Sequence, residues 1–371
     1  MNLGLQITAT SRPADPVLEG WQEQVRSAAA RQTTLVIEGR GSKSFYGRPI
    51  AGESFATAPY QGIIDYEPTE LVITARGGTP LAEIDAALAE RGQMLAFEPP
   101  RFGGEPTLAG AVAAGLSGPR RMAVGAARDF VLGARLLNGK GELLSFGGQV
   151  MKNVAGYDVS RLLAGSLGCL GVLVEVSLKV LPKPFEETTL CFDLAEAEAL
   201  ARLNGWAGRS LPISASAWFD NALRIRLSGT GPALAVARRT LGGEMVDGDA
   251  AARFWTAVRD QTAEFFTAQP GALIRLSLPD TAPVLTLPGP CLIEWGGAQR
   301  WYLAEPSRLA ELRALAVAHG GHATLFRAPS GHAVDAVFTP LSAPLMSVHR
   351  ALKQRFDPAG VFNRGRMYPE F

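Results

Sequence analysis

The chain has 371 residues, of which 47% are hydrophobic and 19% are charged, a length that suits two domains and a composition that excludes a disordered chain. Its 36 basic and 35 acidic residues leave a net charge of +1, so no basic surface for nucleic acid is expected. The 41 glycines and 25 prolines follow no collagen period, and we expect them in turns and at close backbone contacts.

The cysteines argue against a metal centre or a disulfide framework in this chain. The 3 cysteines lie far apart and form no Cys-x-x-Cys pair, so no zinc ribbon, iron–sulfur cluster or other metal site is expected. The uncharged stretch 162–174 is too short to cross a bilayer. Because no basic region followed by an apolar run begins the chain, we expect a cytoplasmic protein.

Helices and strands are mixed in the first part of the chain. Apolar residues at helical spacing after Pro16 predict a helix, and the apolar run 34–38 predicts a buried strand. A second strand is predicted over 71–75. A helix is then predicted to begin with Thr79 as its N-cap, followed by a proline, and to stop at Gly92. This mixture indicates an α+β arrangement.

Small residues and a turn signal dominate the next stretch. The segment 108–116 consists mostly of small apolar residues and predicts a helix that another backbone or a flat ligand can approach closely. Strands over 130–137 and 142–146 flank an Asn-Gly-Lys-Gly turn and predict a hairpin. Strict alternation over 171–180 predicts a strand with one apolar and one polar face.

A proline pair, Pro182 and Pro184, marks the predicted domain boundary. From Glu186 to about Pro340 the pattern predicts a mainly antiparallel sheet with helices on one face, and a last helix is predicted over 345–356. The predicted division is a first domain over 1–183, a second over 184–344 and a C-terminal segment over 345–371.

The loop Gly39-Arg40-Gly41-Ser42-Lys43 is a candidate anion site. It follows a predicted buried strand, and successive backbone N–H groups of such a loop can point at a pyrophosphate. An ordinary glycine-rich turn is the alternative. The spacing matches neither a Walker A loop nor the Rossmann fingerprint, because the further glycines that those motifs need are missing.

Two further segments are candidates for a dinucleotide site. Thr107 through Arg120 offers hydroxyl and N–H donors beside small residues, although a tight core helix followed by a turn would read the same way. Residues 152–158 carry Lys152 and Asn153, and 165–171 carry three glycines, too many for a stable helix interior. A solvated loop is the alternative for the segment with Lys152 and Asn153.

Taken together, these segments resemble the FAD-binding domain of the vanillyl-alcohol-oxidase and p-cresol-methylhydroxylase type. The match runs in order through 39–43, 107–119 and 152–172, and the C-terminal 356–366 is similar to that family's closing motif. The segments Phe97–Pro100, 116–121 and 150–158 are most similar to the FAD-binding E subunits of glycolate oxidase.

The resemblance implies an α+β fold in which a two-subdomain FAD-binding domain is joined to an antiparallel α+β cap or substrate domain, with the C-terminal segment returning to the FAD domain. It also implies the cofactor-binding residues Gly39, Arg40, Gly41, Ser42, Lys43, Thr107, Gly110, Ser117, Gly118, Lys152, Asn153, Gly165, Ser166, Gly171 and Val172. Many relatives attach the flavin to a histidine of the first domain. No histidine precedes His319 here, so we expect noncovalent FAD.

Such a flavoprotein oxidises a 2-hydroxy acid, which requires a cation for the substrate carboxylate and a base for the hydroxyl proton. The candidate cations are Arg327 and Arg366. His322 is the candidate base, with the remaining histidines as alternatives: His319, His332 and His349. Catalytic relatives carry clustered histidines and a His-Gly-Asp-Gly-Asn-like segment, which 320–323 and 330–333 do not reproduce.

Two functions therefore stay open. The chain is either the catalytic flavoprotein subunit of a glycolate dehydrogenase, or a flavin-bearing relay or assembly subunit whose substrate is oxidised on a paralogous FAD subunit. Both imply an iron–sulfur partner, since this chain has no cluster ligands, and such a complex could hold the protein at the inner face of the membrane. A nicotinamide-dependent enzyme or a sugar-binding module is the remaining, non-flavin alternative.

Overall fold

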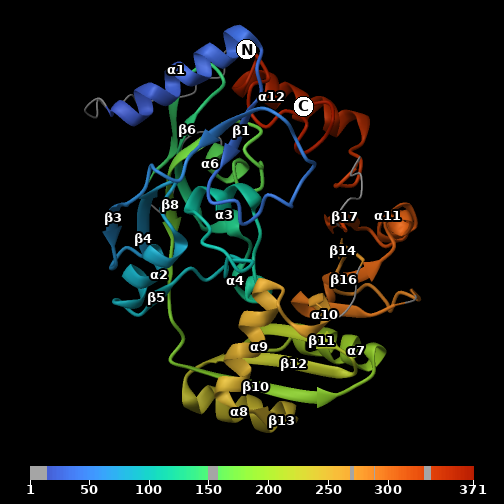
Figure 1. The fold of residues 1–371 in the computed structure, drawn as a ribbon. Helices are drawn as coiled ribbons and strands as arrows, with labels where there is room; N and C mark the ends of the chain where they lie inside the picture. Colours follow the sequence, from blue (N-terminus) through green and yellow to red (C-terminus); the bar gives the residue numbers. More distant parts are fainter. Residues whose placement is uncertain (1–14, 149–157, 268–270, 288, 330–335) are drawn as a thin grey trace.

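The computed structural model describes residues 15–148, 158–267, 271–287, 289–329 and 336–371. Figure 1 shows the N-terminal helix and the C-terminal segment together at one end of the molecule, with the sheet built from the middle of the chain at the other end. No helix within these ranges is long and apolar enough to span a membrane.

The first layer is a helix packed on a two-stranded parallel sheet. The helix α1 (Pro16–Arg31) begins at Asp15, whose side chain accepts a hydrogen bond from the backbone N–H of Val17. It packs on β1 (Leu35–Glu38) and β2 (Glu53–Ala56). The predicted helix and the first strand are confirmed, whereas β2 carries too few apolar residues to be recognised from its pattern.

The second layer is a five-stranded antiparallel sheet. In spatial order its strands are β3 (Ile63–Glu67), β4 (Val72–Arg76), β8 (Val172–Lys179), β6 (Val131–Leu137) and β7 (Leu143–Gly147). The β6–β7 hairpin is confirmed. The predicted polar face of β8 is wrong: Glu175 and Ser177 are buried, because β8 is the central strand. Glu175 accepts a hydrogen bond from Arg135 at 2.9 Å, and the hydroxyls of Ser177 and Thr74 are 2.8 Å apart.

Short helices cover this sheet. They are α2 (Leu81–Ala89), α3 (Leu108–Ala114), α4 (Arg121–Val124), α5 (Ala127–Phe130) and α6 (Val159–Leu162), with a small pair formed by β5 (Gln93–Met94) and β9 (Leu181–Pro182). The predicted N-cap of α2 is wrong. Pro80 occupies that position, and the hydroxyl of Thr79 donates instead to the Arg76 carbonyl at 2.7 Å. The helix also ends before Gly92.

The middle of the chain forms an eight-stranded sheet in which every pair is antiparallel. In spatial order the strands are β13 (Glu244–Val246), β10 (Glu186–Asp193), β12 (Ala222–Gly229), β11 (Ile213–Phe219), β15 (Cys291–Glu294), β16 (Gln299–Ala304), β14 (Ala272–Ser277) and β17 (His322–Arg327). The antiparallel prediction is confirmed.

Helices cover both faces of the large sheet, so the expectation of helices on one face is wrong. One face packs on α7 (Glu196–Ala207), α8 (Gly231–Leu241) and α11 (Leu309–Ala318). On the other face, α9 (Gly248–Asp260) buries Trp255 against Ala215 and Ala217. The short α10 (Glu264–Thr267) follows α9, and both lie between the large sheet and the N-terminal layers (Figure 1).

The chain then returns to the first domain. After α12 (Ala343–Phe356), Phe362 forms a parallel bridge with Leu35 of β1. The ring of Phe356 lies 6.0 Å from that of Phe146. The C-terminal segment therefore completes the first layer rather than the second sheet, as the resemblance implied.

Candidate functional site

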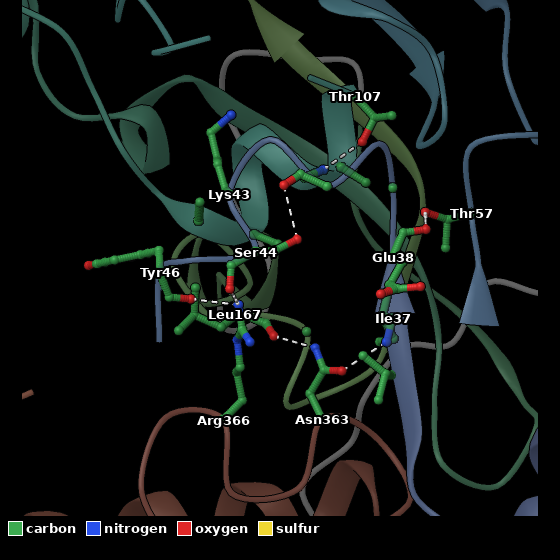
Figure 2. A pocket seen from close by; sticks show the side chains of 18 of the residues that line it. Ile37, Glu38, Lys43, Ser44, Tyr46, Thr57, Thr107, Leu167, Asn363 and Arg366 are labelled. Atoms are coloured by element: carbon green, nitrogen blue, oxygen red, sulfur yellow. Dashed lines mark hydrogen bonds between the residues drawn. The ribbon is translucent and has the colours of Figure 1, made fainter. Parts of the chain in front are cut away.

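A cavity of about 350 Å³ opens where the glycine-rich loop after β1, the N-terminal end of α3 and the C-terminal segment meet. Figure 2 shows its side chains arranged around an open centre, with Thr107 on one side and Asn363 and Arg366 on another. The stretch 167–173 at the start of β8 also lines the cavity, so segments that are far apart in the sequence meet there.

The glycine-rich loop supplies the first wall. Gly41 has a φ of +73°, which a residue with a side chain adopts only with strain. Gly39 lies so close to α3 that a Cβ atom there would come within 2.6 Å of the Thr107 Oγ1. Glycine at 39 therefore permits the loop to lie directly on Thr107, which caps α3 by accepting from the N–H of Gly110.

The part of the lining that the C-terminal segment supplies depends on Asn363, which sequence reasoning missed as a site residue. Its Oδ1 accepts from the N–H of Ile37 at 2.9 Å, and its Nδ2 donates to the Leu167 carbonyl at 2.7 Å (Figure 2). The side chain thereby joins β1 to the loop before β8. Its place in the predicted closing motif 356–366 was the available signal. In the structure Asn363 has a positive φ of 41°, which asparagine adopts more readily than most residues.

Positive charge predominates along the cavity. Arg40, Lys43 and Arg366 line it beside a single carboxylate, that of Glu38. Arg40 pairs with Glu105, and the Glu38 carboxylate accepts from Ser54 at 2.8 Å. Burial lowers the pKa of Lys43 to about 8, with Arg101 acting in the same direction and Asp260 in the opposite one. An anion placed beside Lys43 would reverse this shift.

The structure brings nine of the predicted cofactor residues to this cavity: Gly39, Arg40, Gly41, Ser42, Lys43, Thr107, Gly110, Gly171 and Val172. Lys152 and Asn153 lie outside the described residues. The remaining predicted cofactor residues lie away from the cavity lining. Several residues that line the cavity were not among the predicted cofactor residues: Ile37, Glu38, Thr57, Leu167, Gly168, Leu173 and Asn363.

Of the predicted cofactor residues outside the cavity, Ser117 and Gly118 line a smaller cavity at the contact with the second sheet. The Ser117 hydroxyl accepts from the N–H of Ala127 at 2.9 Å, and the Gly118 carbonyl accepts from the indole of Trp295 at 3.1 Å. Gly165 and Ser166 lie in a loop that is hydrogen-bonded to α3: the N–H of Gly165 donates to the Val112 carbonyl at 3.0 Å, and that of Leu167 donates to the Ala113 carbonyl at 2.9 Å.

The two candidate cations are already engaged within the protein. Arg366 lines the cavity but donates to the carbonyls of Ser44 and Tyr46, at 2.7 and 2.8 Å. It therefore fixes the chain after the glycine-rich loop. Arg327 donates to Gln261 at 2.9 Å and stacks on the ring of Phe45 at 4.8 Å.

The described histidines do not form a cluster. His319 ends α11, His349 lies on α12, and His322 begins β17, while His332 lies outside the described residues. Partial burial lowers the pKa of His322, and nearby Arg275 and Arg121 lower it further. Among the described residues no group of three or more His, Cys, Asp or Glu side chains is placed to hold a metal ion.

The cavity fits the diphosphate end of a dinucleotide. At Gly39 the loop has no Cβ atom where it meets α3. The lining carries three cations against one carboxylate, and it includes the hydroxyl groups of Ser42 and Thr107 and the backbone of the glycine-rich loop. Charge-assisted hydrogen bonds from such donors are the stronger kind. Together with the fold, this site defines a flavoprotein with an FAD-binding domain beside an antiparallel second domain.

Comparison with known proteins agrees with this class. Residues 19–147 match the family described as an FAD binding domain. The chain is 51% identical over 348 residues to glycolate oxidase subunit GlcE of Escherichia coli, covering 94% of this chain and 96% of that protein. It belongs to the GlcE family of glycolate oxidase subunits, FAD-dependent oxidoreductases.

More distant similarities share the first domain or the fold. Glycolate oxidase subunit GlcD of Bacillus subtilis is 30% identical over 128 residues, 34% of this chain and 27% of that one. A D-2-hydroxyglutarate dehydrogenase of Xanthomonas citri is 26% identical over 223 residues, 58% of this chain and 47% of that one. The solved structure of alkyldihydroxyacetonephosphate synthase has the same fold, with a TM-score of 0.63 at 13% identity over 92% of this chain and 74% of that chain.

Proposed function

We propose that this chain is a catalytic subunit of a glycolate dehydrogenase complex and oxidises a small 2-hydroxy acid at a noncovalently bound FAD. The observation that supports it most is the identity to glycolate oxidase subunit GlcE over nearly the whole of both chains. When bound, the flavin ring supplies the hydride acceptor. Electrons would pass to an iron–sulfur partner subunit, and a paralogous FAD subunit would complete the complex, at the inner face of the membrane.

In this proposal the chain's own residues hold and orient the dinucleotide. The backbone N–H groups of Gly39–Lys43 and the Lys43 ammonium bind the diphosphate, and Thr107 holds the loop in place. Ser117, Gly118, Lys152, Asn153, Gly165 and Ser166 remain proposed contacts of the rest of the cofactor. The noncovalent attachment rests on the absence of any histidine before His319 in the sequence.

We also propose the division into an FAD-binding domain over 1–183, a second domain over 184–344 and a returning segment over 345–371. The change from the five-stranded to the eight-stranded sheet between β9 and β10 supports the first boundary. The C-terminal segment counts with the first domain because Phe362 pairs with Leu35.

A flavin relay or assembly subunit is the second candidate. It is favoured by the separation of the described histidines onto α11, β17 and α12, which leaves no clustered base. Anaerobic titration of the FAD-loaded chain with glycolate separates the two. Bleaching of the isolated chain's flavin supports catalysis here, whereas a flavin that is reduced only after the partner subunits are added supports the relay.

The phosphate assignment has its own test. Gly41→Asp places a carboxylate against the diphosphate and forces a side chain into a positive φ, so the purified variant should be colourless and should not take up FAD. Gly92→Asp is the matched control, since Gly92 also has a positive φ of 63° but lies on an open surface. A fully yellow Gly41→Asp protein would refute the assignment.

A further inference from the structure

The segment 101–105 lies between the glycine-rich loop and the second domain. It ends two residues before Thr107, which caps α3 at the edge of the cavity. Among the described residues that line the cavity, none comes from this segment. Any effect of the segment on a dinucleotide therefore passes through the loop that it touches.

The end of the segment lies directly on the glycine-rich loop. A Cβ atom at Gly104 would come within 3.2 Å of the Ser42 Cβ, so only glycine permits this approach without a shift of one of the two loops. The carboxylate of the next residue, Glu105, pairs with Arg40. Glu105 is largely exposed, so the ion pair by itself adds little, and the close contact at Gly104 carries most of the restraint.

Phe102 reaches from the first domain to the second. Its φ of +52° is strained for a bulky side chain, and such strain persists where the surroundings hold it. Its ring lies 5.2 Å from that of Phe45, two residues after the glycine-rich loop, and 6.1 Å from that of Phe326 on β17. The ammonium of Lys43 lies 5.6 Å from the centre of the same ring. One side chain thus contacts the loop and the large sheet together.

The start of the segment is anchored to both domains. The N–H of Arg101 donates to the Oδ1 of Asp260, the last residue of α9, at 2.8 Å. Arg259 pairs with the other oxygen of that carboxylate at 2.7 Å. The guanidinium of Arg101 pairs with Asp85 of α2, in the first domain. A movement of α9 would therefore be passed on to the segment.

We propose that residues 101–105 form a strap, which holds the glycine-rich loop in the shape that binds the FAD diphosphate and makes FAD binding depend on the second domain. Phe102, Gly104 and Glu105 are then positioning residues, because they act on FAD through the loop. The inference rests on the proposed placement of the diphosphate at Gly39–Lys43. It applies to the catalytic subunit and to the relay subunit alike.

The strap couples two events that are otherwise separate. A loop that is held in its binding shape in advance costs less to order when the ligand arrives. Because the second domain holds one end of the strap, the contact between the domains favours FAD binding. By thermodynamic linkage, bound FAD must favour that contact to the same extent.

The first test replaces Gly104 with valine in the full chain and measures FAD affinity by fluorescence titration of the FAD-free protein. Gly104 is not among the residues with a positive φ, so valine tests the close contact with Ser42 alone. The Kd for FAD should rise about tenfold, because an added side chain forces the two loops apart. Gly208→Val is the matched control, since Gly208 has a φ of −84° and a Cβ there meets no atom within 4 Å.

The second test acts from the second domain. Asp260→Ala removes the acceptor of the Arg101 N–H and should also raise the Kd for FAD about tenfold. Loss of a negative charge would by itself favour a bound diphosphate, so charge predicts a change of the opposite sign. Asp249→Ala is the matched control, because Asp249 is an exposed acid at the other end of α9. This variant pair keeps the proposal testable if Gly104→Val fails to fold.

A third measurement follows the strap itself, because a general loss of structure would also weaken FAD binding. Hydrogen exchange of the segment 101–105 is measured by mass spectrometry with and without FAD. In the unsubstituted protein and in Gly208→Val, FAD should slow exchange in this segment. In Gly104→Val at saturating FAD the slowing should be lost.

Unchanged FAD affinity in both Gly104→Val and Asp260→Ala would overturn the proposal, as would exchange in 101–105 that FAD does not slow in the unsubstituted protein. Failure of the proposed function would look different. A yellow Gly41→Asp protein would refute the placement of the diphosphate and, with it, the action of the strap on that loop. A colourless Gly41→Asp protein beside strap variants that bind FAD normally would leave the placement standing and refute the strap alone.

Discussion

At the scale of single residues, Glu294 is a fully buried acid at the contact between the domains. It is 4% exposed, and its Oε2 accepts from the Trp301 indole at 2.6 Å and from the Gln299 amide at 3.0 Å. Burial raises its pKa to about 7, while these two hydrogen bonds act in the opposite direction. Two neutral donors therefore hold a carboxyl group that has no cation among its described partners.

Glu294→Gln should change how stability depends on pH. Between pH 4.5, the ordinary pKa, and about 7 the folded protein binds the proton more tightly than the unfolded chain, so the free energy of unfolding falls as pH rises through this window. The amide does not titrate and still accepts both hydrogen bonds. We expect the variant to be more stable by about 1–3 kcal/mol at pH 8 and equal at pH 4 in denaturant unfolding. Parallel pH profiles for the two proteins would contradict this.

The sequence was informative about the glycine-rich loop and silent about Arg275 and Glu294. A glycine pair after a buried strand has few structural uses, so it could be singled out. An arginine or a glutamate within an alternating strand looks like any solvated position. Only the pairing of β14, β15 and β16 beside the turn at 117–119 brings both residues to this contact, where Glu294 is buried and Arg275 is partly buried.

At the scale of elements, the return segment is held by one buried lysine. The ammonium of Lys353 donates to Asp357 at 2.7 Å, to the Phe362 carbonyl at 2.7 Å and to the Cys169 carbonyl at 2.8 Å. Asp357 in turn accepts from the N–H groups of Val361 and Phe362. This network positions the residues just before Asn363, which lines the cavity beside the glycine-rich loop.

Lys353→Met should therefore damage both stability and cofactor binding. It leaves Asp357, which is 1% exposed, without its cation, a change that costs about 3–5 kcal/mol of unfolding free energy. FAD affinity should fall in a fluorescence titration because Asn363 loses its support. Adding Asp357→Asn should recover part of the stability, and Lys140→Met on an exposed turn should have little effect. Unchanged unfolding in Lys353→Met would show that the network is not needed.

The elements were predicted unevenly, for physical reasons. The β6–β7 hairpin carries its own turn signal, and α1 and β8 carry clear periodicity, so their positions followed from local sequence. The short β2 and β3 expose most of their residues and depend on partners elsewhere in the chain. Lys353 lies four residues before Asp357. This is also the spacing of an ordinary exposed ion pair on a helix, so the burial of Lys353 could not be foreseen.

At the scale of the whole molecule, the two sheets are joined by a charge network and by the returning chain. Arg226 of the large sheet donates to Glu98 of the first domain at 2.8 Å. The Arg120–Glu187 pair and the Trp295–Gly118 hydrogen bond cross the same contact. The sequence indicated two domains and the return of the chain. It did not indicate this contact, because each of its pairs joins residues far apart in sequence.

Phe185 offers a way to test how the domains hold together. It lies between β9 and β10 and is 89% exposed, so limited chymotrypsin digestion should cut there and yield fragments 1–185 and 186–371. Because the second fragment carries α12 and the Phe362 bridge to Leu35, the cut protein should remain one species in native gel filtration and keep its FAD. Phe185→Ala should resist the cut. Fragments that separate under native conditions would mean that the return segment does not anchor the second domain.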